Sequence, residues 1–493
     1  CKYLLGIMQP HAYIAYTRKS FMPFPSITFI FLFFPITLIL YYILPRKKWR
    51  TIVLVATSLG FFIFADPTHI HVLILSILIN YFGGRLIGKV KDQKNGKLAR
   101  TYMWIGVLLN LLLLGFYKYT GFFLDIISTI LPININHTDP ALPLGISFFT
   151  FSGISYLLDV YNGINPSEKN LISFSAYMIM FPKLLQGPIT RFIEVKDAFN
   201  GPKFTPLSIM EGVRRFIGGL AKKVILADSL NVATNQIFTA NFNQMGAGLA
   251  WFGIIAYTLQ IYLDFSGYTD MAIGIGQILG FKFPENFNYP YISRSLTDFW
   301  RRWHITLGSW FRTYLFIPLE FARKKEKFLR QQSNLLIVFF LTGLWHGANW
   351  NFVIWGVFYG VILAIEASGF NKLLRKINPF FQHFYSIVII VMGWVFFRIT
   401  DIKQWGAFFK ALIGMNGWTN DVTFRSLNIL FYIPFIIPGI LFSLPYMHQF
   451  GEKVKSKMGK ALLTLDLGYI ALFLFTLTYI VSKGFTAFMY LDF

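Results

Sequence analysis

The chain has 493 residues, of which 55% are hydrophobic, 19% aromatic and only 14% charged. A soluble globular protein carries roughly 25% charged residues, so this composition excludes an ordinary soluble protein and favours a membrane protein. The net charge of +23 does not indicate nucleic-acid binding, because the Lys and Arg residues form short clusters between apolar segments, as in cytoplasmic loops. The single cysteine, Cys1, excludes a disulfide framework, a thiolate metal site and an internal cysteine nucleophile.

Apolar segments recur along almost the whole chain from Phe24 onward. Many contain runs of about 20 residues, the length needed to cross a hydrocarbon core of roughly 30 Å. They predict an all-α polytopic membrane protein with about 10 to 12 transmembrane helices. Tyr102 to Ile130 is expected to form one long crossing or two short ones. We expect residues 22–493 to form a single transmembrane domain and residues 1–21, which do not resemble a signal peptide, to be a non-native or disordered extension.

Two segments contain too many prolines and polar residues to be lipid-facing helices. They are residues 180–191 and residues 285–318. Irregular backbone at membrane depth persists only where it is buried in protein or lines a watery cavity. We therefore expect re-entrant or amphipathic helices here, as walls of a central site.

His346 lies within Leu-Thr-Gly-Leu-Trp-His-Gly-Ala-Asn-Trp-Asn, residues 341–351. The surrounding apolar segment, Leu335 to Ile365, is expected to form one span, which would place His346 roughly 16 Å from its start and near the bilayer midplane. An ionisable group at that depth is costly and indicates function. Asn349 and Asn351 are candidates for hydrogen bonding to a substrate. The alternative is a neutral histidine that bonds a neighbouring helix.

His304 lies within residues 296–312, which we expect to form one amphipathic helix. At about 100° per residue, one face carries the apolar and aromatic residues Trp300, Trp303, His304, Leu307 and Phe311, and the other carries Asp298, Arg301, Arg302, Ser309 and Arg312. A membrane-surface helix and a helix lining a site both fit this pattern. The arginines would bind the phosphates of a nucleotide-bearing donor or lipid headgroups.

Acidic residues within apolar segments complete the set of candidates. Asp264 and Asp270 are expected either to orient a histidine or to form ion pairs with Lys222, Lys223 or an arginine. Two isolated histidines do not support a metal site, and none is predicted. The candidate catalytic residues are thus His346 and His304, and the candidate substrate-binding residues are Trp300, Arg301, Arg302, Trp303, Trp345, Asn349, Asn351, Asp264 and Asp270.

Several long motifs resemble those of the membrane-bound O-acyltransferase (MBOAT) family, in the family's order. They are Pro-Leu-Gly-Ile-Ser-Phe-Phe-Thr-Phe (143–151), Gly-Pro-Ile-Thr-Arg (187–191), Gly-Leu-Ala-Lys-Lys-Val (219–224), Asp-Phe-Ser-Gly-Tyr-Thr-Asp-Met-Ala (264–272) and the two histidine motifs. The sequence is most similar to the bacterial branch of alginate O-acetylation proteins and peptidoglycan O-acetyltransferases. It departs from that branch at residues 320–323, where Glu-Phe-Ala-Arg replaces Gly-Gly-Asn-Arg.

The resemblance implies helices around a central funnel, in a bacterial inner-membrane enzyme. It also implies that His346 is a general base and that His304 orients or polarises a reactant. Acetyl-CoA is the expected co-substrate, with no bound cofactor. The expected acceptor is an exported polysaccharide, reached directly or through a periplasmic partner of the SGNH-hydrolase type. The alternatives are D-alanyl transfer from a carrier protein to teichoic acid and, in another class, an ion or solute transporter.

Overall fold

The computed structural model describes residues 22–44, 46–131, 135, 137–199, 201, 204–326, 329–418, 428–447, 449, 451 and 462–484. The predicted extension, residues 1–21, lies outside the described residues. All regular elements in the described ranges are helices, which confirms the all-α prediction. The chain divides into two compact units. The first unit comprises Cys1–Phe216, Met271–Pro284 and Lys483–Phe493. The second unit comprises Ile217–Asp270 and Glu285–Ser482. Whether residues 22–493 act as a single domain stays a prediction.

The first unit begins with long apolar helices and continues with shorter ones. Its elements are η1 (Phe29–Phe33), α2 (Phe34–Ile43), α3 (Lys47–Ala65), η2 (Pro67–His69), α4 (Ile70–Asp92), α5 (Gly96–Ile130), α6 (Ile146–Asn162), α7 (Leu171–Ile179), α8 (Phe181–Leu184), α9 (Phe192–Phe199) and most of α10 (Pro206–Ala221). The segment 102–130 is therefore part of one long helix. Residues 180–191 contain only the four-residue helix α8, so the expected irregular backbone is present there.

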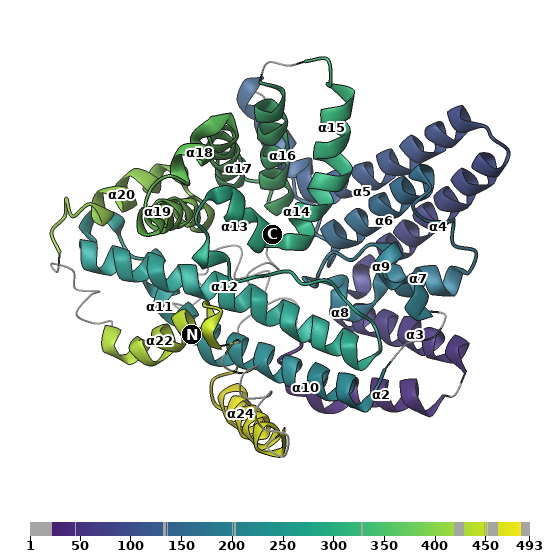
Figure 1. Cartoon of the computed structure of the whole chain (residues 1–493), viewed down its shortest axis with the longest axis horizontal. Coiled ribbons are helices and arrows are strands. Elements are labelled where there is room, and N and C mark those ends of the chain that lie inside the picture. Colours follow the sequence, from purple (N-terminus) through teal and green to yellow (C-terminus); the bar gives the residue numbers. More distant parts are fainter. Residues whose placement is uncertain are drawn as a thin grey trace. The chain divides into compact units, whose positions relative to one another are not determined.

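In the first unit, α4 and α5 lie side by side and both pack on α6 (Figure 1). Asn80 of α4 and Asn110 of α5 are fully buried and exchange two hydrogen bonds, at 3.0 and 2.9 Å. Paired amides between membrane helices contribute on the order of 1 kcal/mol, because neither amide can bond to water. This pair sets how α4 and α5 align along their length.

The second unit holds both histidine motifs. Its elements are η3 (Lys222–Ala227), α11 (Asp228–Phe238), η4 (Phe242–Gln244), most of α12 (Ala247–Ile278), η5 (Pro290–Ile292), α13 (Leu296–Arg302), α14 (Ile305–Phe311), η6 (Arg312–Phe316), α15 (Ile317–Ala322), α16 (Arg330–His346), α17 (Trp350–Ile365), η7 (Glu366–Phe370), α18 (Asn371–Leu374), α19 (Pro379–Arg398), η8 (Ile402–Gln404), α20 (Trp405–Leu412), η9 (Ile429–Tyr432), α22 (Ile433–Phe442) and α24 (Leu462–Lys483).

Seven helices among the described residues are long and apolar enough to cross a membrane: Lys47–Ala65, Pro67–Asp92, Gly96–Ile130, Ala247–Ile278, Trp350–Leu374, Pro379–Arg398 and Leu465–Lys483. Shorter apolar helices, Phe29–Ile43 and Ile429–Phe442, add to them. Large apolar side chains on α5 point outward, with Leu112 and Phe116 each 58% exposed. Such a surface is stable in lipid but not in water, which supports a polytopic membrane protein.

The prediction of a single span over 335–365 is wrong. The segment forms two helices, α16 and α17, that pack side by side and are joined by residues 347–349 (Figure 1). Two glycines allow the close approach: a Cβ atom on Gly343 would lie 2.3 Å from the carbonyl oxygen of Phe352, and one on Gly356 equally close to that of Phe339. His346 is therefore the last residue of α16 and does not lie in the middle of a span.

The prediction of one continuous helix over 296–312 is also wrong. The helix stops at Arg302 and restarts at Ile305, because His304 adopts a left-handed conformation with φ 45°. A residue other than glycine in this region costs on the order of 1–3 kcal/mol, so surrounding contacts must hold it. The consequence is that His304 occupies a sharp turn between α13 and α14.

Candidate active site

His346 is enclosed by aromatic side chains of the second unit. Its imidazole is 3% exposed. The ring centroid lies 5.1 Å from that of Trp345, 5.0 Å from that of Trp355 on α17 and 5.4 Å from that of Phe397 on α19, all in edge-on arrangements. The end of α16 thus delivers an ionisable group into an apolar enclosure, where proton transfer to or from it is shielded from water.

His304 is held by Asn286, a residue of the irregular segment 285–318. The Nδ1 atom of His304 lies 3.0 Å from Oδ1 of Asn286. This oxygen also accepts hydrogen bonds from the backbone N–H and the hydroxyl of Thr306, at 3.2 and 2.8 Å. The contact with the backbone N–H identifies this atom of the Asn286 amide as the oxygen and not the nitrogen. Since an oxygen without a hydrogen can only accept, Nδ1 of His304 is the donor, which leaves a lone pair on Nε2.

The Nε2 atom of His304 is buried and has no hydrogen-bond partner among the residues that the structure describes. The ring of Phe265 packs edge-on against the His304 imidazole, and the two ring centroids are 4.7 Å apart. Burial lowers the pKa of the His304 imidazole to about 3. The side chain is therefore neutral at physiological pH and offers a single hydrogen-bond acceptor.

Acidification is expected to weaken the fold through His304. Its pKa is about 3 in the folded protein, against an ordinary value of 6.5, so the unfolded chain binds more protons between these values. Stability is complete above about pH 6.5 and falls as the pH decreases; at pH 5 the loss is about 2 kcal/mol, since one pKa unit corresponds to 1.36 kcal/mol. Thermal melting at pH 7.5 and pH 5 measures the loss. It should be smaller in His304→Gln, and an identical loss in both proteins would contradict the assignment.

Trp345 connects the two histidines. The centroid of the Trp345 ring lies 5.9 Å from that of His304 and 5.1 Å from that of His346. His346 is the residue directly before the break between α16 and α17. Trp300 joins the same cluster from α13, with its ring 5.6 Å from that of Trp355. The structure therefore brings together both candidate catalytic histidines and two of the candidate tryptophans.

Trp303 is buried beside this cluster, 4.9 Å from Trp394. The indole N–H groups of Trp300, Trp355 and Trp394 are buried without a hydrogen-bond partner among the described residues. Buried donors of this kind are uncommon, because leaving one unsatisfied costs on the order of 1–3 kcal/mol. They are available to a carbonyl oxygen of a bound reactant.

The other candidates on α13 lie on the polar face as predicted. Arg301 is exposed, and Arg302 pairs with Asp298 at 2.9 Å. Both arginines therefore stay outside the aromatic cluster. Their predicted contact with phosphates or lipid headgroups stays a prediction.

Asp264 and Asp270 form ion pairs with lysines, the second of the two arrangements expected for them. Asp264 lies 2.5 Å from the buried ammonium of Lys223, which also contacts Asp228 at 2.8 Å. Asp270 lies 2.7 Å from Lys222. Since these pairs tie η3 and α11 to α12, their carboxylates serve the packing of the second unit.

The two asparagines after His346 have structural contacts. Asn349 is exposed, and its side-chain oxygen accepts the N–H of Asn351 and caps the first turn of α17. The amide of Asn351 is fully buried and donates to the carbonyls of Phe396 and Phe397, at 3.3 and 3.4 Å. Asn351 thus ties the start of α17 to the end of α19, beside the ring that contacts His346.

Glu366 anchors the start of α13 although it lies far away in the sequence. Its carboxylate is buried and accepts the backbone N–H groups of Leu296 and Thr297, at 2.7 and 2.8 Å. It also accepts hydroxyls of Thr297 and Tyr385. A carboxylate at a helix N-terminus is stabilised by the helix dipole, so Glu366 fixes the position of the helix that leads to His304.

Replacing this carboxylate is expected to destabilise the second unit. In Glu366→Gln an amide NH2 group would face the N–H donors of α13, and the free energy of unfolding should fall by about 1–3 kcal/mol. Thermal melting of the purified protein tests this. The matched change Glu326→Gln, at an exposed carboxylate that pairs with Arg323, should leave the melting temperature nearly unchanged; equal shifts would refute the anchoring role.

The residues at 320–323, which depart from the pattern of the related branch, close the connection between α15 and α16. Glu320 accepts hydrogen bonds from Arg330 and Asn334, at 2.9 and 2.6 Å. Arg323 donates to the same Asn334 at 2.6 Å. Glu320 thus joins a local polar network with Asn334 and with Arg323, which is common to both patterns.

A profile of the MBOAT family, membrane-bound O-acyltransferases, matches residues 138–402, which include His304 and His346. The chain belongs to this family. It is 38% identical to "Probable alginate O-acetylase AlgI" of Azotobacter vinelandii over 434 residues, 85% of each chain. It is 34% identical to "Peptidoglycan O-acetyltransferase" of Helicobacter pylori over 82% of each chain. With "Teichoic acid D-alanyltransferase" of Bacillus subtilis it shares 32% identity over 51% of this chain and 69% of that protein.

Membership in this family confirms the predicted resemblance and identifies a multi-pass membrane O-acyltransferase. It favours the enzyme over the transporter alternative. The sequence analysis missed Asn286 and the aromatic residues Phe265, Trp355 and Phe397. Asn286 lies in the polar segment 285–318 that was singled out, but its partner is 18 residues away, so no helical or strand spacing could have connected the two.

Proposed function

We propose that this MBOAT enzyme moves an acetyl group from cytoplasmic acetyl-CoA across the bacterial inner membrane toward an exported polysaccharide. The acceptor is alginate-like or peptidoglycan and is reached directly or through a periplasmic relay protein of the SGNH-hydrolase type. The observation that carries the proposal is the pair of buried histidines on either side of Trp345. The names of the relatives, an alginate O-acetylase and a peptidoglycan O-acetyltransferase, suggest the acyl group and the acceptor class.

His346 is the proposed general base. It takes the proton from the acceptor hydroxyl as the hydroxyl oxygen attacks the thioester carbonyl carbon. The tetrahedral intermediate then expels the CoA sulfur, which receives the proton from His346. Positioned general bases contribute about 10² to 10⁴ in rate, and exclusion of water by the aromatic enclosure supports this role.

His304 is the proposed positioning partner. With Nδ1 donating to Asn286, its Nε2 can accept a hydrogen bond but cannot donate one. It therefore suits orientation of a hydroxyl or amide N–H of a reactant, and not polarisation of the thioester carbonyl. The low pKa of about 3 makes it a weak base, which leaves proton removal to His346. The buried indole N–H groups are the candidates to stabilise the developing oxyanion.

The test of this function is transfer of label in proteoliposomes that contain the purified enzyme. One set receives acetyl-CoA labelled in the acetyl group and the other receives carrier protein already loaded with labelled D-alanine as its thioester, each with cell-envelope polysaccharide on the opposite side. We expect label in the polysaccharide only from acetyl-CoA. Transfer of D-alanine without transfer of acetyl would replace the proposal with alanylation. Adding the periplasmic SGNH-type protein to acetyl-CoA reactions separates relayed from direct transfer.

A further inference from the structure

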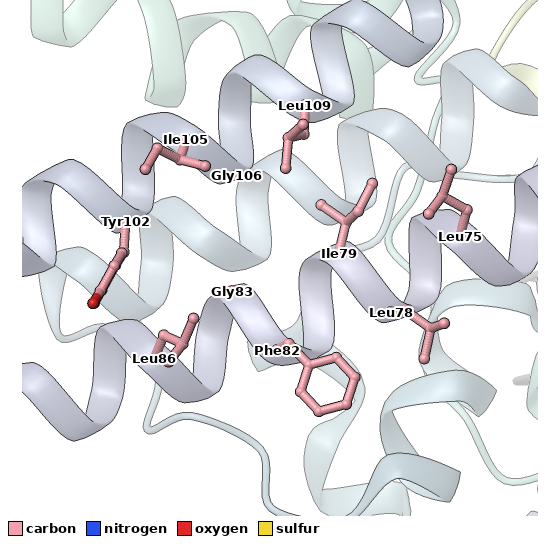
Figure 2. A pocket seen from close by; sticks show the side chains of 10 residues that line it. All are labelled: Leu75, Leu78, Ile79, Phe82, Gly83, Leu86, Tyr102, Ile105, Gly106 and Leu109. Carbon is pink, nitrogen blue, oxygen red and sulfur yellow. The ribbon is translucent and has the colours of Figure 1, made fainter.

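A narrow groove runs along the outer faces of α4 and α5 in the first unit. Its volume is about 290 Å³. Figure 2 shows the leucine, isoleucine and phenylalanine side chains that flank it, with Gly83 and Gly106 between them. Tyr102 carries the one polar side chain among its lining residues, so a ligand inside the groove finds no other side-chain polar partner. This lining selects a hydrocarbon chain.

The groove has the length of one membrane leaflet. On α4 its lining runs from Leu75 to Leu86. Eleven residues at about 1.5 Å each give roughly 16 Å, and half of a hydrocarbon core of about 30 Å is about 15 Å. An acyl chain from one leaflet therefore fills it from end to end.

The end of the groove at Leu86 and Tyr102 adjoins the turn between α4 and α5, which is strongly basic. Residues 85–100 contain the cations Arg85, Lys89, Lys91, Lys94, Lys97 and Arg100 and a single acidic residue, Asp92. Lys89 follows Phe82 and Leu86 at helical spacing, so it continues the groove-lining face of α4 toward the membrane surface. Figure 2 shows the Tyr102 hydroxyl directed across the groove toward Leu86. The charge at this end complements a phosphate headgroup.

We propose that the groove binds an anionic glycerophospholipid of the cytoplasmic leaflet. One acyl chain lies between α4 and α5, and the phosphate lies among Lys89, the Tyr102 hydroxyl and the other cations of the turn except Lys91, whose ammonium donates to the carbonyls of Val160 and Tyr161. The basic turn faces the cytoplasm by the positive-inside rule, which sets the leaflet. Each lysine near such a headgroup strengthens binding about fivefold. The site is independent of the acyl-transfer reaction.

Native mass spectrometry of the full-length protein, released from detergent with equal amounts of phosphatidylglycerol and phosphatidylcholine, tests the proposal. The wild type should retain phosphatidylglycerol in excess. Lys89→Gln should lower phosphatidylglycerol affinity about fivefold, the equivalent of about 1 kcal/mol. Leu86→Trp, which places an indole at the mouth of the groove, should reduce retention of both lipids.

Matched controls separate the groove from the remaining lipid surface. Ile74 and Leu86 lie on the same helix and are both 45% exposed, but Ile74 does not line the groove, so Ile74→Trp should leave lipid retention unchanged. Lys48→Gln, at an exposed cation on α3, controls for charge. Equal retention of the two lipids by the wild type, or equal effects of Leu86→Trp and Ile74→Trp, overturns the proposal. A change from dimer to monomer in Leu86→Trp also overturns it, because the occupant would then be a second copy.

Discussion

Replacement of His346 by alanine is expected to reduce acetyl transfer by at least about 100-fold, with the enzyme still inserted and folded. The loss is expected because the variant lacks the proposed general base, and positioned general bases typically contribute about 10² to 10⁴ in rate. The imidazole is buried among Trp345, Trp355 and Phe397, which limits the access of bulk water to this position. The measurement is the initial rate of label transfer from acetyl-CoA to polysaccharide in proteoliposomes.

His346→Gln is the companion variant, because glutamine nearly fills the volume of histidine but cannot take a proton. It should be as inactive as His346→Ala and should melt closer to the wild type. His71→Gln, at an exposed histidine of α4, serves as the control and should retain full activity. An active His346→Gln variant would show that a hydrogen bond, and not proton transfer, is what this position supplies.

Loss of the contact between His304 and Asn286 is expected to have the second largest effect. His304→Ala removes the acceptor atom Nε2, and Asn286→Leu removes the oxygen that holds Nδ1 and the backbone of Thr306. Groups that orient metal-bound histidines typically contribute about 10- to 100-fold, and we take this range as the guide for His304. We expect each single variant to lose activity in this range, measured as the rate of acetyl transfer at saturating acetyl-CoA.

The double variant distinguishes a positioning role from a general loss of folding. If Asn286 acts only through His304, the two changes together should cost little more than His304→Ala alone, because the effects of residues that act as a unit are not additive. Multiplication of the two losses would mean that Asn286 and His304 act separately. Thermal melting of all three variants accompanies the kinetics, since Asn286 is also buried and bonded to Thr306.

The class of this protein follows from its sequence alone. The low charge, the repeated apolar segments and the basic clusters between them are local properties, and they are sufficient for an all-α membrane protein. The two histidines stood out because an ionisable side chain in an apolar segment is costly, whatever the fold around it. The long motifs around them were sufficient for the family, which the comparisons confirm.

The tertiary structure decided where each helix breaks. The turn at Gly347–Asn349 carried a local signal, since asparagine is a good helix N-cap, but the flanking apolar residues concealed it behind an apparent span. The break at His304 carried no such signal, because neither Trp303 nor His304 is a glycine or a proline. It exists because Asn286 offsets the strain of the left-handed conformation by bonding both His304 and Thr306.

Contacts distant in sequence likewise decided what surrounds the candidate catalytic residues. Glu366 holds the start of α13 from 70 residues away, and Asn351 reaches Phe396 across 45. Helical periodicity reports which residues share a face of one helix, whereas these partners belong to different helices and meet only after packing. The sequence therefore determined which side chains are the candidates for the chemistry, and the packing of the helices determined the neighbours of the two histidines, the tautomer of His304 and the burial of both rings.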